Sequence, residues 1–186
     1  MIRAAAVAAV VCAMASACTE AVSEYSRYGS HFVFDNGTHL NPKAAEALTP
    51  YSGVFCTVEE KLQGGARAYV FTTSYGQSAS SQTYKSEAQQ PFRLGFNNGL
   101  VIGYGAIDPP TLYVFDRECP NCFSPDAIPV RSRPLSLGTA GTAECENCKR
   151  VYDLNSGGIV AKGDKGVKLT RYHATCTGPY GVLVVR

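Results

Sequence analysis

The sequence predicts an all-β fold, mainly antiparallel, with one or two short helices. Short runs of β-branched and aromatic residues recur along the chain, and turn signals containing Gly, Pro and Asn separate them. The 186 residues include 18 Gly and 11 Tyr, a composition that suits short strands and many turns. Only one segment carries a clear helical start signal.

The composition also bounds the class of protein. Hydrophobic residues make up 45% and charged residues 17% of the chain, which is typical of a globular protein and not of a disordered one. The length suits one domain, and no internal repeat is apparent. Because the formal net charge is only +2 and the basic residues are scattered, we expect no nucleic-acid partner.

Residues 1–17 have the features of a signal peptide. Arg3 supplies a positive start, and the apolar run 4–15 has the length of a signal core and is too short to cross a bilayer. The run ends in Ala15-Ser16-Ala17 before Cys18, a pattern similar to a bacterial lipobox. We therefore expect Cys18 to be the lipidation site.

This reading predicts a bacterial cell-envelope protein that is anchored to a membrane through its N-terminal lipid, on the periplasmic or the cell-surface side. The same small residues before Cys18 also fit ordinary signal peptidase, and the protein is then secreted with Cys18 unmodified. The polar residues 18–28 are expected to form a tether. Residues 29–186 are expected to form a single β domain.

The first elements of the domain are a strand and a helix. The apolar run 31–34 ends at an Asp-Asn-Gly turn signal. Asn41 followed by Pro42 has the pattern of an N-cap and a first helical residue, so a helix is predicted over 43–48.

Two strands follow the helix. The β-branched and aromatic runs 53–58 and 67–73, with the turn 63–65 between them, predict a hairpin. The polar stretch 74–91 predicts either a short exposed helix over 80–88 or a loop.

A second hairpin is predicted from 92–96 and 100–104, because Asn97-Asn98-Gly99 is a strong turn signal between two apolar runs. The strand 111–116 then leads directly to Cys119. Later strand signals are weaker and lie between Gly-rich turns, at 134–137, 150–153, 159–160, 167–172 and 181–185.

The strongest chemical signal is a pair of Cys-x-x-Cys motifs, Cys119-Pro-Asn-Cys122 and Cys145-Glu-Asn-Cys148. Two residues between the sulfurs let both thiolates of one tight turn face one ion, and two such turns complete a tetrahedron. Cys119, Cys122, Cys145 and Cys148 are therefore the expected metal ligands, within a metal-binding subdomain over 117–163.

Secretion leaves two alternatives for these thiols, a pair of disulfides or a redox-active dithiol. The compact grouping favours metal over disulfides, and the absence of a helical pattern after either motif argues against a redox dithiol. Cys56 and Cys176 lie apart from the motifs. Cys56 has the setting of a small buried hydrophobe, and its pairing with Cys176 is left open.

From Cys119 to about Tyr172 the chain resembles a Rieske-type domain, which implies a Rieske-like β-sandwich or meander. The family places Cys-x-His on one loop and Cys-x-x-His on a second, followed by an aromatic–Asp pair and a Gly-rich turn. Cys145 and Cys148 stand at the second motif's Cys and His, and Tyr152-Asp153 match the aromatic–Asp pair. The combination is also similar to a group of bacterial lipoproteins.

The departure from the family concerns the ligands. Cys122 lies one residue beyond the position of the family's first His, and none of the three His in the chain is next to either motif. A Rieske cluster needs two His on one iron, so four thiolates favour other centres. Zn²⁺ in a structural site is the leading expectation. A single iron, a [2Fe–2S] cluster and a vacant or oxidised site are the alternatives.

Other residues near the motifs have weaker signals. Lys149 and Arg150 either offset the negative charge of a four-thiolate site or are ordinary solvated cations. Tyr152 is expected in the core and Asp153 in a turn cap. His173 is the one candidate general base, and a satisfied strand residue is the simpler reading of it. With no nucleophile–base pair or open metal position, the sequence predicts a non-enzyme.

Taken together, these signals predict a lipid-anchored envelope protein with a structural metal centre, and they name no protein partner. The competing hypothesis is an iron or [2Fe–2S] electron-transfer protein.

Overall fold

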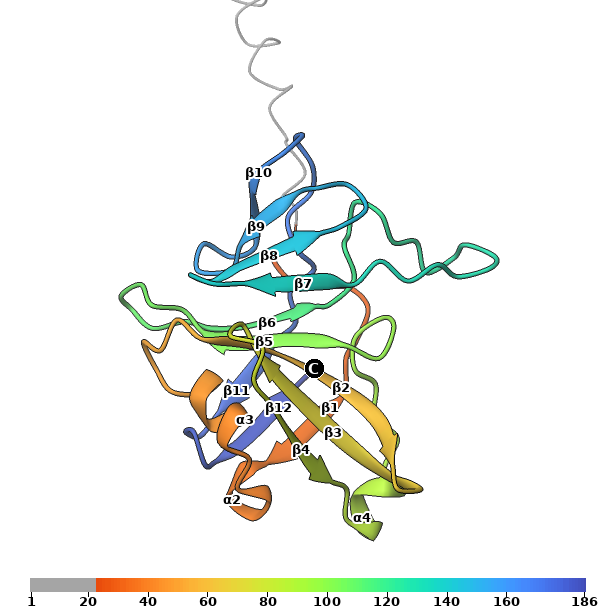
Figure 1. Ribbon diagram of the computed structural model, residues 1–186, viewed down its shortest axis with the longest axis vertical. Helices are drawn as coiled ribbons and strands as arrows, with labels where there is room; N and C mark the ends of the chain where they lie inside the picture. The colour runs from red at the N-terminus through yellow and green to blue at the C-terminus, as the bar shows by residue number, and fades with distance from the viewer. Residues whose placement is uncertain (1–22) are drawn as a thin grey trace, which may run out of the picture.

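A computed structural model describes residues 23–186 and arranges them in three antiparallel sheets with three short helices (Figure 1). The all-β prediction is therefore confirmed. The expected signal peptide 1–17 and lipidation site Cys18 lie outside the described residues. Within residues 23–186, no helix has both the length and the apolar character that a membrane crossing requires.

The central layer is a five-stranded sheet with the order β4-β3-β2-β5-β6. Its strands are β2 (Phe55–Gln63), β3 (Ala66–Thr73), β4 (Ser78–Gln82), β5 (Leu100–Tyr104) and β6 (Leu112–Asp116). The predicted β2–β3 hairpin is confirmed, and its turn uses Gly64 and Gly65 with φ of +59° and +82°.

The two faces of this sheet enter two separate cores. Along β5, Leu100 and Ile102 pack into one core and Val101 into the other, as the alternation of side chains in a strand requires. Both faces are covered, which explains why β5, β6 and the first half of β2 are mostly apolar.

A three-stranded sheet covers the first face, in the order β1-β12-β11. Its strands are β1 (Phe32–Asp35), β11 (Ala174–Cys176) and β12 (Val182–Val185). Phe32 and Phe34 of β1 pack against Phe71 and the apolar side chains of β5 in the first core.

The three helices lie at this end of the molecule: α2 (Asn36–His39), α3 (Pro42–Ala47) and α4 (Lys85–Ala88) (Figure 1). The predicted cap of α3 is confirmed, because the Asn41 side chain accepts from the N–H groups of Lys43 and Ala44, both at 3.0 Å. The predicted turn after β1 is instead the single-turn helix α2, which begins where Asp35 accepts from Gly37 N–H at 3.0 Å.

A four-stranded meander covers the second face, in the order β10-β9-β8-β7. Its strands are β7 (Leu135–Gly138), β8 (Thr142–Cys145), β9 (Val151–Asp153) and β10 (Ile159–Lys162). In Figure 1 this sheet lies above β5 and β6, on the opposite side from β1, β11 and β12. Phe115, Leu135 and Tyr152 fill the second core between the layers.

The predicted hairpin of 92–96 with 100–104 is wrong. Segment 92–96 makes a single bridge, from Arg93 to His31, while β5 pairs with β2 on one side and β6 on the other. A strand can pair along only two edges. Because β2 and β6 occupy both edges of β5, segment 92–96 cannot pair with β5.

Two further predictions need correction. The stretch 80–88 does not form one helix, because β4 adds to the edge of β3 and only α4 is helical. Segment 167–172 is not a strand, since its backbone bonds go to different layers: Leu169 N–H to Gly158, and Tyr172 N–H to Val114 of β6, both at 2.8 Å. It is the connection between the meander and the three-stranded sheet.

Candidate metal centre

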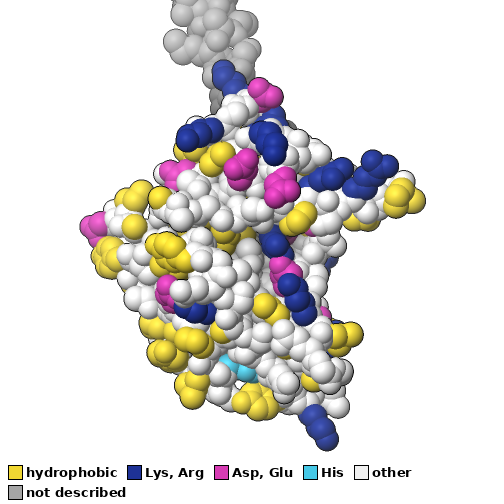
Figure 2. Space-filling model, in the orientation of Figure 1, with side chains coloured by type: hydrophobic (Ala, Val, Ile, Leu, Met, Phe, Trp, Pro, Cys, Tyr) yellow, Lys and Arg dark blue, Asp and Glu magenta, His cyan; other side chains and the backbone are white. Residues whose placement is uncertain are grey.

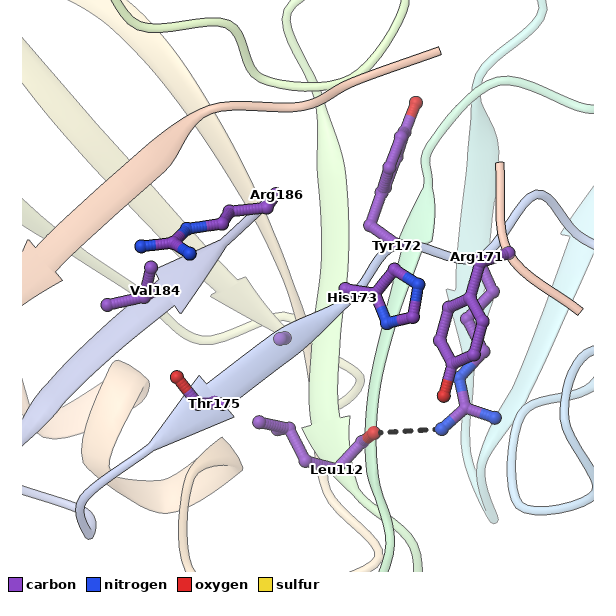
Figure 3. A pocket seen from close by; sticks show the side chains of 9 residues that line it. Leu112, Arg171, Tyr172, His173, Thr175, Val184 and Arg186 are labelled. Atoms are coloured by element: carbon purple, nitrogen blue, oxygen red, sulfur yellow. Dashed lines mark hydrogen bonds between the residues drawn. The ribbon is translucent and has the colours of Figure 1, made fainter. Parts of the chain in front are cut away.

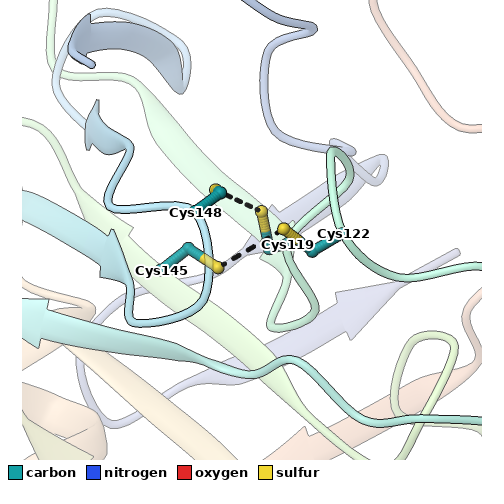
Figure 4. Close-up of side chains that lie close together, drawn as sticks. All are labelled: Cys119, Cys122, Cys145 and Cys148. Carbon is teal, nitrogen blue, oxygen red and sulfur yellow. Dashed lines mark hydrogen bonds between the residues drawn. The ribbon is translucent and has the colours of Figure 1, made fainter. Parts of the chain in front are cut away.

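The two Cys-x-x-Cys turns meet at the interface between the central sheet and the meander. The first follows β6, and the second begins at the last residue of β8. The four Sγ atoms all lie within 4.8 Å of one another (Figure 4). The structure therefore brings together all four residues that the sequence predicts as ligands: Cys119, Cys122, Cys145 and Cys148.

The sulfur spacing fits one tetrahedral ion. The Sγ atoms of Cys119 and Cys148 are 3.8 Å apart, and those of Cys122 and Cys145 are 3.9 Å apart. Four sulfurs at about 2.3 Å from a central ion have tetrahedral edges of about 3.8 Å. A disulfide has sulfurs about 2 Å apart, and all four thiols are free.

Backbone hydrogen bonds hold each turn in the ligating shape. The Cys119 carbonyl accepts from the N–H groups of Cys122 at 3.0 Å and Phe123 at 2.8 Å. The Cys145 carbonyl accepts from Lys149 N–H at 2.8 Å, with Lys149 in the left-handed region at φ +58°. These turns point both sulfurs of each motif to the same side.

Exposure divides the ligands into two pairs. Cys119 and Cys145, the first residue of each motif, are buried in the second core, whereas Cys122 and Cys148 are half-buried. The centre is therefore anchored in the core on one side and open towards solvent on the other.

Two buried carboxylates organise the approach to the first turn. Asp116 accepts from the N–H groups of Glu118 and Phe96, both at 2.7 Å, and from the Tyr172 hydroxyl at 2.8 Å. Glu118 accepts from Asn97 at 2.7 Å and from Ser132 at 2.6 Å. Sequence reasoning missed both residues, although a carboxylate directly after a buried strand is an available signal.

Asp116 gives the fold a pH dependence. Burial raises the pKa of its carboxyl to about 6, although its three hydrogen bonds favour the charged form. Between the ordinary pKa of 3.8 and about 6, the folded chain therefore holds a proton that the unfolded chain releases. The resulting stabilisation is complete below pH 3.8 and is lost as the pH rises through about 6, a change of roughly 3 kcal/mol.

We expect Asp116→Asn to remove this pH dependence. The unfolding free energy of the wild type minus that of the variant should decrease by roughly 3 kcal/mol from pH 4 to pH 7. Urea titration at each pH measures both values. Asp164→Asn, at an exposed position, is the control. A pH-independent difference for Asp116→Asn would contradict the assignment.

A tyrosine hydroxyl donates to the most buried sulfur. The Tyr152 hydroxyl is 3.2 Å from Cys119 Sγ, and Asn121 Nδ2 donates to the same hydroxyl at 2.8 Å. Because the Asn121 amide group occupies the acceptor side of the hydroxyl oxygen, its proton is directed at the sulfur. Tyr152 is fully buried as expected, but sequence reasoning missed this contact with the centre.

Asn121 is held in place by a second pair of bonds. Its Nδ2 donates to the Val167 carbonyl at 2.9 Å, and its Oδ1 accepts from Val167 N–H at 3.0 Å. The first Cys-x-x-Cys turn is thereby tied to the segment that connects the meander to the C-terminal strands.

The exposed sulfurs have their own donors. Asn147 Nδ2 donates to Cys122 Sγ at 3.3 Å. The Arg150 guanidinium donates to the carbonyls of Asp164 at 3.0 Å and Lys165 at 3.1 Å, and it lies near enough to Cys148 to lower the pKa of that thiol. Of the two cations left open by the sequence, Arg150 is thus placed against the centre, where it can offset the charge of −2 that four thiolates and a divalent ion carry. The surface around the meander otherwise carries charges of both signs (Figure 2).

The thiols differ in acidity. Burial raises the pKa of Cys119 to about 12, against hydrogen bonds from Tyr152 and from Asn121 N–H. Burial also opposes ionisation of Cys148, but the donors of Arg150 and the neighbouring thiols outweigh it and lower its pKa to about 6. A bound cation displaces the remaining protons, so metal affinity at this site rises with pH.

The other sequence candidates lie away from this site. Asp153 caps the turn after β9, where it accepts from the N–H groups of Asn155 and Ser156 at 2.9 and 3.3 Å. Cys56 and Cys176 do not form a disulfide. Burial raises the pKa of the Cys56 thiol, as expected for an inert core residue.

His173 lines a separate cavity of about 310 Å³ beside β11 (Figure 3). Its ring stacks on Tyr25 at 3.6 Å, and within residues 23–186 its side chain makes no hydrogen bond. Ser26 N–H donates to the Arg171 carbonyl at 2.7 Å, so the described part of the expected tether packs against this wall.

Comparison of the chain with protein-family models, with curated proteins and with solved structures finds no match. The resemblance to Rieske-type domains therefore stays a prediction that rests on the motifs.

Proposed function

We propose that this is a metal-binding protein of the bacterial cell envelope, in which four cysteines hold one Zn²⁺ ion that stabilises the fold. The observation that carries the proposal is the convergence of the four sulfurs within 4.8 Å. Four protein ligands complete a tetrahedron and leave no open position for a substrate, which is the arrangement of structural zinc sites.

The span of the site supports one ion over a two-iron cluster. A [2Fe–2S] cluster binds one pair of cysteines on each iron, so sulfurs on opposite irons lie farther apart than sulfurs that share an ion. Here every pair among the four sulfurs lies within 4.8 Å, including the cross-motif pairs at 3.8 and 3.9 Å, so no two of them are as far apart as ligands of opposite irons. Each motif thus supplies two corners of one tetrahedron.

The position of the site supports a structural role. The first motif extends from the central sheet and the second from the meander, and Cys119 and Cys145 belong to the core between these layers. An ion bound by all four cysteines would cross-link the two layers at the edge of their shared core.

A mononuclear iron site that transfers one electron is the second candidate. The half-exposure of Cys122 and Cys148 favours it, because it leaves a short path from the ion to a partner at the surface. Donors to the sulfurs, such as the Tyr152 hydroxyl and Asn147, are also known to tune the potential of iron–thiolate centres.

Metal analysis and a visible spectrum of the purified protein decide between the two. The structural proposal expects about one zinc per chain and no visible absorption. Red-brown protein with stoichiometric iron would contradict the zinc proposal and support the electron-transfer role. Protein that is folded without any bound metal would eliminate both.

The location in the envelope is a separate part of the proposal, supported by the apolar run 4–15 and the lipobox-like residues before Cys18. We also propose that the fold is a Rieske-like scaffold. The two cysteine loops that face each other and the Tyr152-Asp153 pair support this.

Cys18→Ala is expected to move the protein from the membrane to the soluble fraction, because the acylated side chain is lost. Fractionation of bacterial cells followed by immunoblotting measures the shift. Cys12→Ala, within the expected signal peptide, is the matched control and should leave the distribution unchanged. Equal membrane fractions for wild type and Cys18→Ala would contradict anchoring through this residue.

A further inference from the structure

The outer edge of β1 presents backbone groups without partners. In the three-stranded sheet, the odd-numbered residues of β11 form the backbone hydrogen bonds to β12. The bond from Thr177 N–H to the Val182 carbonyl, at 3.2 Å, continues this pattern just beyond β11. On its other edge, β12 forms its hydrogen bonds with the even-numbered residues of β1. The bond from Asn36 N–H to the Gly181 carbonyl, at 3.0 Å, continues this second pattern. The N–H and C=O groups of Val33 and the N–H group of Asp35 therefore point away from the sheet, whereas the Asp35 carbonyl belongs to the start of α2.

The chain begins to cover this edge and then leaves it. His31 and Arg93 exchange two backbone bonds, of 3.0 and 2.8 Å. The next bonded pair of such a ladder would join Val33 to Pro91, which has no N–H to donate. Among residues 23–186, the N–H and C=O groups of Val33 and the N–H group of Asp35 have no hydrogen-bond partner.

The space between the edge and the departing chain is a cavity of about 270 Å³. Val33, with an exposed fraction of 46%, lies on one side and Pro91 on the other. Phe92 and Tyr69 form an apolar wall, with ring centroids 5.5 Å apart in an edge-to-face arrangement. The remaining lining residues are His31, Asp35, Glu87 and Gln90.

We propose that this slot binds an extended peptide segment, which pairs antiparallel with β1 and carries a basic side chain opposite Asp35 and an apolar one opposite Val33. Antiparallel pairing places the residue facing Asp35 two positions before the residue facing Val33, so the recognised sequence is Lys/Arg-Xaa-Val/Ile. The peptide backbone satisfies the open groups of β1, and its side chains supply the specificity.

Charge and length select this occupant. The Asp35 and Glu87 carboxylates line the slot, and both have partners: Asp35 accepts from Gly37 N–H and the Thr38 hydroxyl, and Glu87 pairs with His39 at 3.0 Å. The partners of Asp35 are uncharged, so its negative charge is available to a peptide, whereas the Arg67 guanidinium beside Phe92 is paired with Glu60. The open edge ends at the His31–Arg93 pair, which leaves only Val33 to Asp35 for pairing. That length is too short for the edge strand of a second copy, since strands that pair between domains are about five residues long.

The test uses the full-length, metal-loaded protein and the probe Ac-Ala-Lys-Ala-Val-NH₂ at millimolar concentration, with detection by amide NMR shifts. We expect saturable shifts at Val33 and Asp35. The same peptide with an N-methyl group on its Val nitrogen should bind roughly tenfold more weakly, because one backbone hydrogen bond is lost. A Lys→Glu peptide should also bind several-fold more weakly, because like charges then face each other across the pair.

A protein variant provides a second readout. Val33→Lys removes the apolar contact with the peptide Val and places a cation diagonal to the peptide Lys, so it should weaken binding of the probe several-fold. Ile159→Lys, at a position of similar exposure on β10 (49% against 46%), is the matched control and should bind like wild type. Absence of shifts at Val33 and Asp35, or equal binding of the parent and the N-methylated peptide, would overturn the proposal. The metal centre takes no part in these measurements.

Discussion

Replacing Cys145 with Ser is expected to lower the melting temperature by roughly 10–20 °C, with loss of the bound metal. Cys145 is buried, ends β8 and is one of the two core-side cysteines of the proposed site. A hydroxyl is a poor ligand for a soft ion, and metal binding at a structural site is coupled to folding. The free energy that the ion contributes to the folded state is therefore lost together with the ligand.

Cys176→Ser is the matched control for this experiment. The Cys176 thiol is half-buried, lies outside the centre and donates to the Gly178 carbonyl at 3.1 Å. A serine hydroxyl can make the same bond, so this variant should melt within a few degrees of wild type and keep its metal. Equal melting temperatures for Cys145→Ser and Cys176→Ser, measured by thermal unfolding with metal analysis, would refute the structural role.

Tyr152→Phe is expected to weaken metal binding roughly tenfold while the chain stays folded. The substitution removes the hydroxyl that lies 3.2 Å from Cys119 Sγ, and the ring remains in the second core. A thiolate buried beside apolar side chains then loses one of its donors. The loss also leaves Asn121 Nδ2 without its hydroxyl acceptor, although its bond to the Val167 carbonyl persists.

Competition against a chelator measures this affinity, and Tyr113→Phe is the control. The Tyr113 ring packs against the same core, but its hydroxyl donates to the Asn155 carbonyl at 3.1 Å and not to a sulfur. Both variants lose one hydrogen-bonded hydroxyl, so a decrease confined to Tyr152→Phe isolates the contact with the sulfur. Equal affinities in the two variants would show that the hydroxyl does not stabilise the bound ion.

Features encoded by neighbouring residues were predictable. The cap of α3 depends on Asn41 and Pro42 alone, and the β2–β3 hairpin depends on two strand-forming runs around Gly64 and Gly65. The failures involve strand edges. Whether 92–96 forms a hairpin with β5 depends on β2 and β6 reaching both edges of β5 first, and no local pattern contains that information.

For the site, the sequence alone predicted which four cysteines converge, because a Cys-x-x-Cys turn creates a possible chelating pair from residues three apart, and two such pairs suit one tetrahedral ion. It also determined the all-β class through short apolar runs and turn residues. The tertiary structure decided which layers the centre joins, which sulfurs are buried and which groups donate to them. Asn121, Tyr152 and Val167 meet only when three separated segments pack together, and the unpaired edge of β1 exists only because the ladder with 91–93 stops at a proline. Such contacts arise from the packing of distant segments, which local residue spacing does not specify.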